Sequence, residues 1–147
     1  MTVLSEASPR AVRAIEWTGR AVAAHCTSAG RALLLDHDAA SLRALYGRGA
    51  LSAPGPRAPR EVDELARRVA AARRRGYAVV DEEFEPGLVG VGAPVRDFRG
   101  RIVAGLNVSA PKFRLGRRLA LAGREVKAAA DELSGRLGWQ GNGGRDA

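Results

Sequence analysis

The sequence predicts an α/β (α+β) domain in which a central antiparallel sheet is flanked by helices. Its 147 residues are the size of one ordinary domain, and 46% of them are hydrophobic. Residues 60–76 and 113–138 carry apolar side chains at helical spacing. Between them, residues 76–95 have the pattern of a strand, a turn and a second strand, and residues 102–109 that of a returning strand. Mixed elements in this order place the sheet at the centre.

The composition excludes several classes of protein. A single cysteine, Cys26, cannot form an internal disulfide framework or a multi-cysteine zinc site. No apolar run approaches the roughly 20 residues that span a bilayer, and the N-terminus does not resemble a signal peptide. We therefore expect a cytoplasmic protein with no membrane partner and no metal or other cofactor. The net charge of +8 permits contact with nucleic acid, but the arginines are spread along the chain, which favours solvated faces.

The first half of the chain predicts one strand and two short helices. Residues 8–17 alternate as a strand does, and residues 25–36 have the pattern of a helix opening. A second helix is expected to begin after Asp38 and to end at Gly47. The proline- and glycine-rich residues 47–59 predict a loop.

Two longer helices are expected on either side of the central strands. Residues 60–76 are strongly amphipathic, with Val62, Leu65, Ala66, Val69 and Ala72 as the buried stripe and with the acid–base pairs Asp63–Arg67 and Glu64–Arg68. The second is one long helix, weakened at Gly123 and ended by Gly138, with the stripe Leu115, Leu119, Ala122, Val126, Ala129, Leu133 and Leu137. We assign residues 1–138 to the domain and residues 139–147 to a flexible tail.

The hairpin of residues 88–109 sorts its side chains into two unlike faces. If Phe98 and Arg99 form a two-residue turn, valine, alanine and leucine residues share one face, which must be core. The other face pairs Gly92 with Gly105 and Gly90 with Asn107, so it is short of side chains. Such a face suits a small pocket with a few polar groups, or it lets a helix approach the sheet closely. The spacing alone leaves both alternatives open.

Two further patterns each allow a functional interpretation and a purely structural one. His25 and Cys26 are the only neighbouring base and nucleophile, but adjacent residues rarely point at each other, so we expect no enzyme. Glu82 and Glu83 either end a strand in solvent or hold the sheet edge to a helix.

Several short motifs occur together over residues 8–137. They are His-x-x-x-x-Gly-Arg-Ala from His25, Gly-Tyr with a Glu-Glu end over 76–83, Gly-Leu at 87–88, Ala-Pro-Val at 93–95 and Ser-x-Pro at 109–111. In this combination the sequence resembles the C-terminal effector-binding domain of the isocitrate-lyase-regulator (IclR) family of transcriptional regulators. The resemblance implies a GAF-like fold and a small organic or aromatic acid as the ligand.

The resemblance also implies where that ligand lies. The family's pocket segments correspond here to Thr27, Ser28, Ala29, Leu88, Gly90, Asn107 and Ser109. The backbone N–H groups at the helix opening could hold a carboxylate, which agrees with the general preference of anions for helix N-termini. Val80 and Gly90 stand where some members carry an acidic residue and a cysteine, so the site is less polar here. The resemblance therefore favours a pocket, and not close helix packing, as the reason why this face of the hairpin has few side chains.

The N-terminal part of the family pattern does not align with this chain. Members carry a winged helix-turn-helix, a linker helix and the first sheet strands ahead of the matched region. We expect this chain to be the sensing domain alone, with DNA reached only through a helix-turn-helix domain absent from it. A sheet without those strands exposes an edge, which predicts a homodimer or homotetramer. The alternative is a ligand-free oligomerisation or interaction module derived from the same domain.

Overall fold

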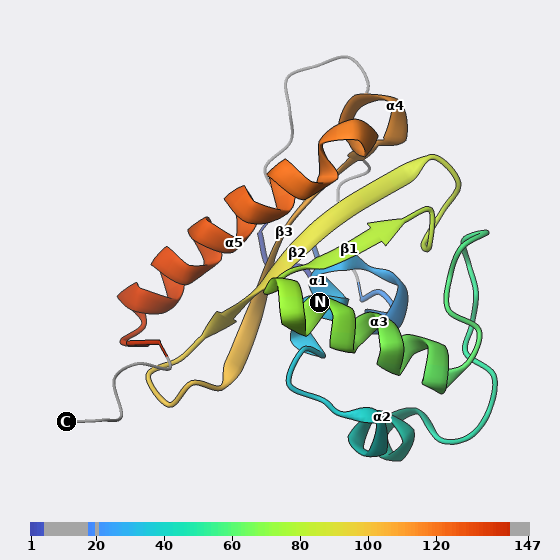
Figure 1. Ribbon diagram of the computed structural model, residues 1–147, viewed down its shortest axis with the longest axis horizontal. Helices are drawn as coiled ribbons and strands as arrows, with labels where there is room; N and C mark the ends of the chain where they lie inside the picture. The colour runs from blue at the N-terminus through green and yellow to red at the C-terminus, as the bar shows by residue number, and fades with distance from the viewer. Residues whose placement is uncertain (5–17, 20, 142–147) are drawn as a thin grey trace.

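A three-stranded antiparallel sheet lies at the centre of this computed structural model, which describes residues 1–4, 18–19 and 21–141 (Figure 1). The strands are β1 (Ala78–Asp81), β2 (Leu88–Arg96) and β3 (Ile102–Pro111), and they lie side by side in that order. The strand expected over residues 8–17 lies outside the described residues. The predicted fold class, an antiparallel sheet flanked by helices, is confirmed.

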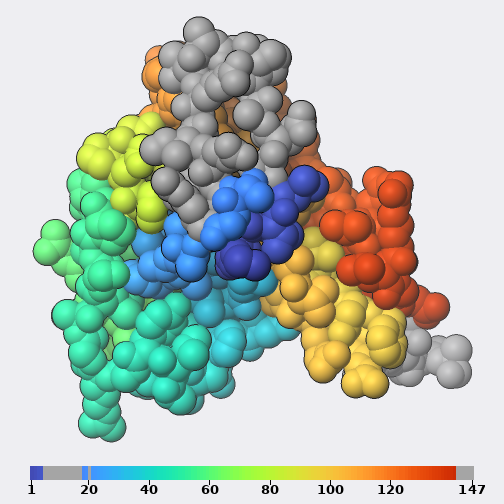
Figure 2. Space-filling view, turned by 180° about the vertical axis from the view of Figure 1, so that it is seen from behind, coloured from blue at the N-terminus to red at the C-terminus, as the bar shows by residue number. Residues whose placement is uncertain are grey.

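Helices cover both faces of the sheet. Before it come η1 (Ala24–Cys26), α1 (Ser28–Leu33), α2 (Ala39–Tyr46) and α3 (Val62–Arg75); after it come α4 (Lys112–Leu115), η2 (Gly116–Arg118) and α5 (Leu119–Arg136). α5 packs on one face, whereas α1 and α3 pack on the other and α2 packs on α3 (Figure 1). Seen from behind, residues 21–24 (blue) lie between the cyan-green region of α2 and the yellow-orange hairpin (Figure 2).

The register of the hairpin differs from the predicted one. Gly92 pairs with Asn107, two residues further along β3 than predicted. The turn is wider than two residues because the Asp97 carboxylate accepts hydrogen bonds from the backbone N–H groups of Arg99 and Arg101. A bulge lies next to the turn, where the register shifts between Val95 and Arg96. Because the shift is even, residues 104–109 keep their predicted faces, but across the bulge Ile102 packs with Leu35, Ala72 and Ala78 on the face opposite to the predicted one.

The β2 half of the predicted apolar face is core, whereas Ala104 and Val108 on the β3 half are exposed. The β2 half packs against α5 in a cluster of Tyr77, Val91, Ala93, Val95, Val126 and Ala130. Gly123 of α5 makes this contact possible, because a Cβ there would lie 2.2 Å from the Tyr77 ring. Gly123 is therefore a packing residue inside α5 and not the weak point of the helix that the sequence suggested.

The long C-terminal helix is broken, which the sequence did not predict. The break lies at η2, because Lys112 at the start of α4 is tied to the sheet end and α5 must then turn to run along the sheet. The buried stripe also differs: Ser134 is buried whereas Leu133 and Leu137 are exposed. Ser134 fits there because its hydroxyl accepts from the Arg96 N–H and donates to the Ala130 carbonyl.

The helices on the other face follow the predictions more closely. Asp38 caps α2 by accepting from the Ser41 N–H at 2.8 Å, but Leu45 is exposed and not part of the apolar face. α3 buries the predicted valine, leucine and alanine stripe, apart from the half-buried Ala66, and ends at Gly76, whose φ of 82° favours glycine. Glu64 pairs with Arg68 as predicted. Asp63 does not pair with Arg67; it pairs with Arg43 of α2.

None of the helices among residues 1–4, 18–19 and 21–141 combines the length and the apolar character that crossing a bilayer requires.

Candidate functional site

Four of the seven predicted ligand residues come together on the α1 side of the sheet. The Asn107 amide nitrogen donates to the Ser28 hydroxyl at 3.3 Å and to the Ser109 hydroxyl at 3.2 Å. A Cβ on Gly90 would lie 2.7 Å from the Ser109 oxygen and 2.8 Å from the Ser28 oxygen. These residues, Ser28, Gly90, Asn107 and Ser109, are called the polar cluster below. Ser28 is buried, whereas Asn107 is exposed, so the cluster reaches from the interior to the surface.

The other predicted residues lie around this cluster. Thr27 precedes α1, but its hydroxyl donates to the Ala23 carbonyl at 3.0 Å and does not cap the helix. Ala29 lies over Gly105, whose absent Cβ would meet the Ala29 carbonyl at 2.6 Å. Leu88 starts β2 and pairs with Pro111, beyond Ser109.

The beginning of α1 lies directly on the glycine-rich face of the sheet. A Cβ on Gly92 would lie 2.4 Å from the Ser28 carbonyl oxygen. Together with the contact at Gly105, this shows that close helix packing explains two of the glycines. Gly90 differs, since its neighbours are the two serine hydroxyls. Close helix packing therefore accounts for Gly92 and Gly105, whereas two serine hydroxyls occupy the space over Gly90.

A buried ion-pair network lies behind the polar cluster, and the sequence analysis did not identify it. Arg31 of α1 is 1% exposed, and its guanidinium binds both carboxylate oxygens of Glu83, which is 5% exposed, and the His25 carbonyl. Arg68 of α3 also pairs with Glu83, at 2.8 Å. Of the two alternatives for Glu83, the tie between the sheet edge and a helix is the correct one. The sequence feature that could have indicated the burial of Arg31 is its position directly before the apolar residues 32–35.

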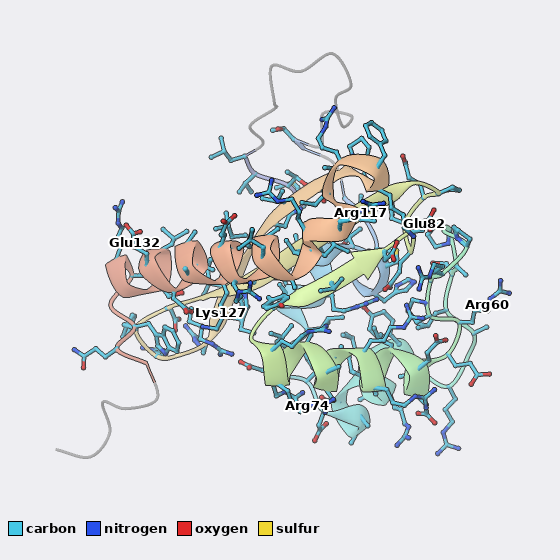
Figure 3. All side chains as sticks on the ribbon, turned by 45° about the horizontal axis from the view of Figure 1, so that its top comes forward. Arg60, Arg74, Glu82, Arg117, Lys127 and Glu132 are labelled. Carbon is cyan, nitrogen blue, oxygen red and sulfur yellow. The ribbon has the colours of Figure 1, made fainter. Side chains whose placement is uncertain are left out.

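A second set of charges fixes the loop between β1 and β2. The Lys112 ammonium lies 2.9 Å from Asp81 and 2.7 Å from Glu82, while the Lys112 N–H donates to the Gly87 carbonyl. Glu82 lies at the end of β1 with a φ of 55°, and its other oxygen accepts from the Gly87 N–H (Figure 3). The hydrogen bond from Lys112, with that from Gly87, lowers the pKa of Glu82 below its ordinary value. This loop is thereby held beside the Leu88 end of the site.

The histidine and cysteine do not form a catalytic pair. The His25 ring nitrogen Nε2 lies 2.6 Å from the Ser52 carbonyl, and the ring stacks edge-on against Tyr46. Cys26 is buried, with its sulfur 3.7 Å from the Ala23 carbonyl. Burial raises the pKa of the Cys26 thiol, which opposes formation of the reactive thiolate.

Two surface hollows lie away from the polar cluster. Their volumes are about 380 and 530 Å³, and they lie along α2 and α3 around Arg43 and Asp63. None of the seven predicted ligand residues lines either of them. Within the described part of the chain, no three His, Cys, Asp or Glu side chains gather as metal ligands.

Comparison with known proteins identifies the family to which this chain belongs. Residues 2–135 match the family model of the bacterial transcriptional regulator IclR C-terminal domain. This chain belongs to the IclR family. The resemblance drawn from the motifs is confirmed, and the matched relatives are transcriptional regulators, not enzymes.

Individual relatives support the same assignment. The Pca regulon regulatory protein of Pseudomonas putida is 40% identical over 91 residues, which are 62% of this chain and 31% of that protein. The HTH-type transcriptional regulator BhcR of Paracoccus denitrificans is 32% identical over 124 residues, which are 84% of this chain and 44% of that protein. The chain thus spans less than half the length of these relatives.

The fold is shared with a solved regulator. The crystal structure of the Agobacterium tumefaciens repressor BlcR superposes with a TM-score of 0.78 at 28% identity, covering 84% of this chain and 50% of that one. The sheet with α5 on one face and α1 and α3 on the other is therefore the C-terminal domain architecture of these regulators.

Proposed function

We propose that this chain is the GAF-like sensing domain of a cytoplasmic IclR-type regulator and that it binds a small organic or aromatic acid at the polar cluster. The observation that carries the proposal is the convergence of Ser28, Asn107 and Ser109 over a glycine, Gly90. Hydroxyl and amide groups that converge in this way can bind a carboxylate in a chosen orientation. In this proposal the two bonds from Asn107 to the serines are exchanged for bonds to the ligand.

The residues around the cluster suit a small ligand with an apolar part. Val80 pairs with Gly90 and is buried, and Leu88 lies two residues before Gly90 in β2. A short aliphatic chain or an aromatic ring can contact these side chains while its carboxylate reaches the amide and hydroxyls. We propose that the ligand changes the association of the subunits in a homodimer or homotetramer, and that DNA is bound by a helix-turn-helix domain of the whole regulator.

The test is a thermal-shift and calorimetric screen of the purified chain with small aliphatic and aromatic carboxylic acids. A ligand that binds only the folded state raises the Tm by mass action. Once one acid raises the Tm, N107A and S109A are expected to weaken its binding about ten-fold or more, because each removes a hydrogen bond to a charged group. The matched control is S52A, which removes an exposed hydroxyl remote from Asn107 and should leave the affinity unchanged. Equal affinity in N107A, S109A and S52A would exclude the polar cluster as the site.

A ligand-free interaction module is the second candidate. The observation that favours it is the contact of the α1 backbone with the sheet at Gly92 and Gly105, which occupies part of the glycine-rich face. This candidate predicts that no acid in the screen raises the Tm of the chain while the protein still associates with itself.

A further inference from the structure

Arginines without a carboxylate partner gather on α3 and on the segment that leads into it. Among the described residues, six exposed arginines of this region form no ion pair, and they are called the arginine face below: Arg48, Arg60, Arg67, Arg73, Arg74 and Arg75. Residues 48–75 hold three acidic residues, and two of them, Asp63 and Glu64, are already paired with arginines. This side of the molecule therefore carries uncompensated positive charge.

The packing of α2 on α3 produces part of this charge. Asp63 lies one helical turn before Arg67, but the Nε and Nη2 groups of Arg43 both donate to one Asp63 oxygen, at 3.0 and 2.8 Å. Arg67 is thereby left without a counter-ion. Arg74 lies seven residues further along, on the same side of α3 and about 10.5 Å away along its axis. The two exposed cations thus share one stripe of the helix.

The helix dipole accounts for only the end of the arginine face. Residues 73–75 lie at the C-terminal end of α3, where positive side chains are favourable. Arg67 lies about two turns before that end, and Arg48 and Arg60 precede the helix. Stabilisation of the helix therefore does not explain these three arginines. Because like charges repel one another across such a surface, an external anion is the favourable counter-charge.

The length of the arginine face fits an extended anion better than a small one. α3 has 14 residues and is therefore about 21 Å long. Duplex DNA carries one negative charge per about 1.7 Å of its axis, so it presents about a dozen phosphates over that length. Guanidinium groups bind phosphate oxygens through paired hydrogen bonds. The charge and its extent therefore match a phosphate backbone.

The surface also has room for a phosphate group on this side. A hollow of about 380 Å³ is lined by Arg67 and Arg73 together with three alanines of α2 and α3. The two aspartates that also line it are already engaged, one with the Ser41 N–H and the other with Arg43. Arg73 is fixed at the rim, because its Nε donates to the Leu35 carbonyl at 2.6 Å.

We infer that the arginine face, with Arg67 and Arg74 at its centre, binds the phosphate backbone of duplex DNA without sequence preference. This contact goes beyond the proposed function, in which a helix-turn-helix domain of the whole regulator binds DNA. It rests on that proposal only for its setting, because a regulator held at its site keeps the flanking DNA at a high effective concentration. Contacts to phosphates then add affinity and no sequence information.

The test is binding of the purified chain to a labelled duplex of arbitrary sequence, followed by fluorescence anisotropy. Wild type is expected to bind with a Kd of about 10⁻⁴–10⁻⁶ M, and log K should fall linearly with the log of the salt concentration. R67Q/R74Q removes two phosphate contacts, so it should weaken binding at least ten-fold at about 50 mM salt and reduce the salt slope by about two. Both side chains are exposed, and circular dichroism reports whether the variant is folded.

R117Q/R118Q is the matched control. It removes the same charge from two exposed arginines of η2 that have no ion pair within the part of the chain that the structure describes. Figure 3 shows Arg117 near α4, away from Arg60 and Arg74 beside α3. The control should weaken binding by less than about three-fold and leave the salt slope nearly unchanged. A duplex of unrelated sequence should bind wild type as tightly as the first.

Three results would overturn the inference. They are no binding of wild type at about 50 mM salt, equal loss of affinity in R67Q/R74Q and R117Q/R118Q, and displacement of the duplex by poly-L-glutamate as readily as by unlabelled DNA of equal charge. The last result would assign the arginine face to an acidic protein segment. All three leave acid binding at the polar cluster to the thermal-shift screen, and N107A is expected to bind the duplex as wild type does.

Discussion

The buried ion pair between Arg31 and Glu83 gives the most decisive prediction about stability. E83Q keeps the shape of the side chain but removes its charge, which leaves the guanidinium of Arg31, 1% exposed, without a counter-ion. Removing one partner of a buried pair costs about 3–5 kcal/mol. For comparison, Asp63 and Arg43 pair in solvent, with side chains 57% and 52% exposed, so D63N should cost less than about 1 kcal/mol.

Urea unfolding at pH 7 measures this difference. With a slope of about 2 kcal/mol/M for a domain of this size, the unfolding midpoint of E83Q should fall by about 1.5–2.5 M, and that of D63N by less than about 0.5 M. R31M/E83L removes both charges together and should recover most of the loss, because Arg68 keeps Glu64 as its partner. Equal midpoints for E83Q and D63N would refute the assignment of Arg31 and Glu83 as a mutually dependent buried pair.

Two other perturbations test the packing of α1 and a surface ion pair. G92A places a Cβ 2.4 Å from the Ser28 carbonyl oxygen and should lower the free energy of unfolding by about 1–3 kcal/mol. G49A is the control, because it has open space around it and should change this free energy little. Similar unfolding midpoints for the two variants would contradict the close approach of α1 to the sheet. The hydrogen bond from Arg96 lowers the pKa of Asp36, so this pair stabilises the fold above the unfolded pKa of about 3.9 and the contribution disappears as the pH falls through the lower folded value. The Tm difference between wild type and D36N should therefore be constant from pH 7 to 5 and shrink below pH 4; a difference independent of pH would show that the Asp36 charge is not involved.

Elements specified by local signals could be predicted from the sequence. α3 has an apolar stripe at helical spacing and a glycine that ends it, and both are found in the structure. The faces of residues 88–95 and 104–109 were predicted correctly although their register was not, because the error was an even number of residues; Ile102, beyond the bulge, lies on the other face. The register itself depends on the Asp97 carboxylate, which binds backbone N–H groups within the turn, and strand periodicity carries no information about that contact.

Elements that depend on distant contacts were missed. Gly123 resembles a helix breaker in sequence, but the Tyr77 ring from the sheet occupies the space beside it. Arg31 resembles a solvated residue, but its charge is compensated by Glu83, 52 positions away, and its guanidinium also binds the His25 carbonyl. The polar cluster was proposed from a family resemblance, since Ser28 and Asn107 are 79 positions apart and no local pattern joins them.

α1 gives a physical basis for coupling between the site and the rest of the domain. This six-residue helix contributes Ser28 to the polar cluster and Arg31 to the buried ion-pair network, while its first turn contacts the sheet at Gly92. A ligand that took the place of the Ser28–Asn107 hydrogen bond would move the start of α1 relative to β3. The backbone of Ser28 lies so close to Gly92 that not even a Cβ would fit between them, so α1 has no space to approach the sheet. Such a movement must therefore be outward or along the strands.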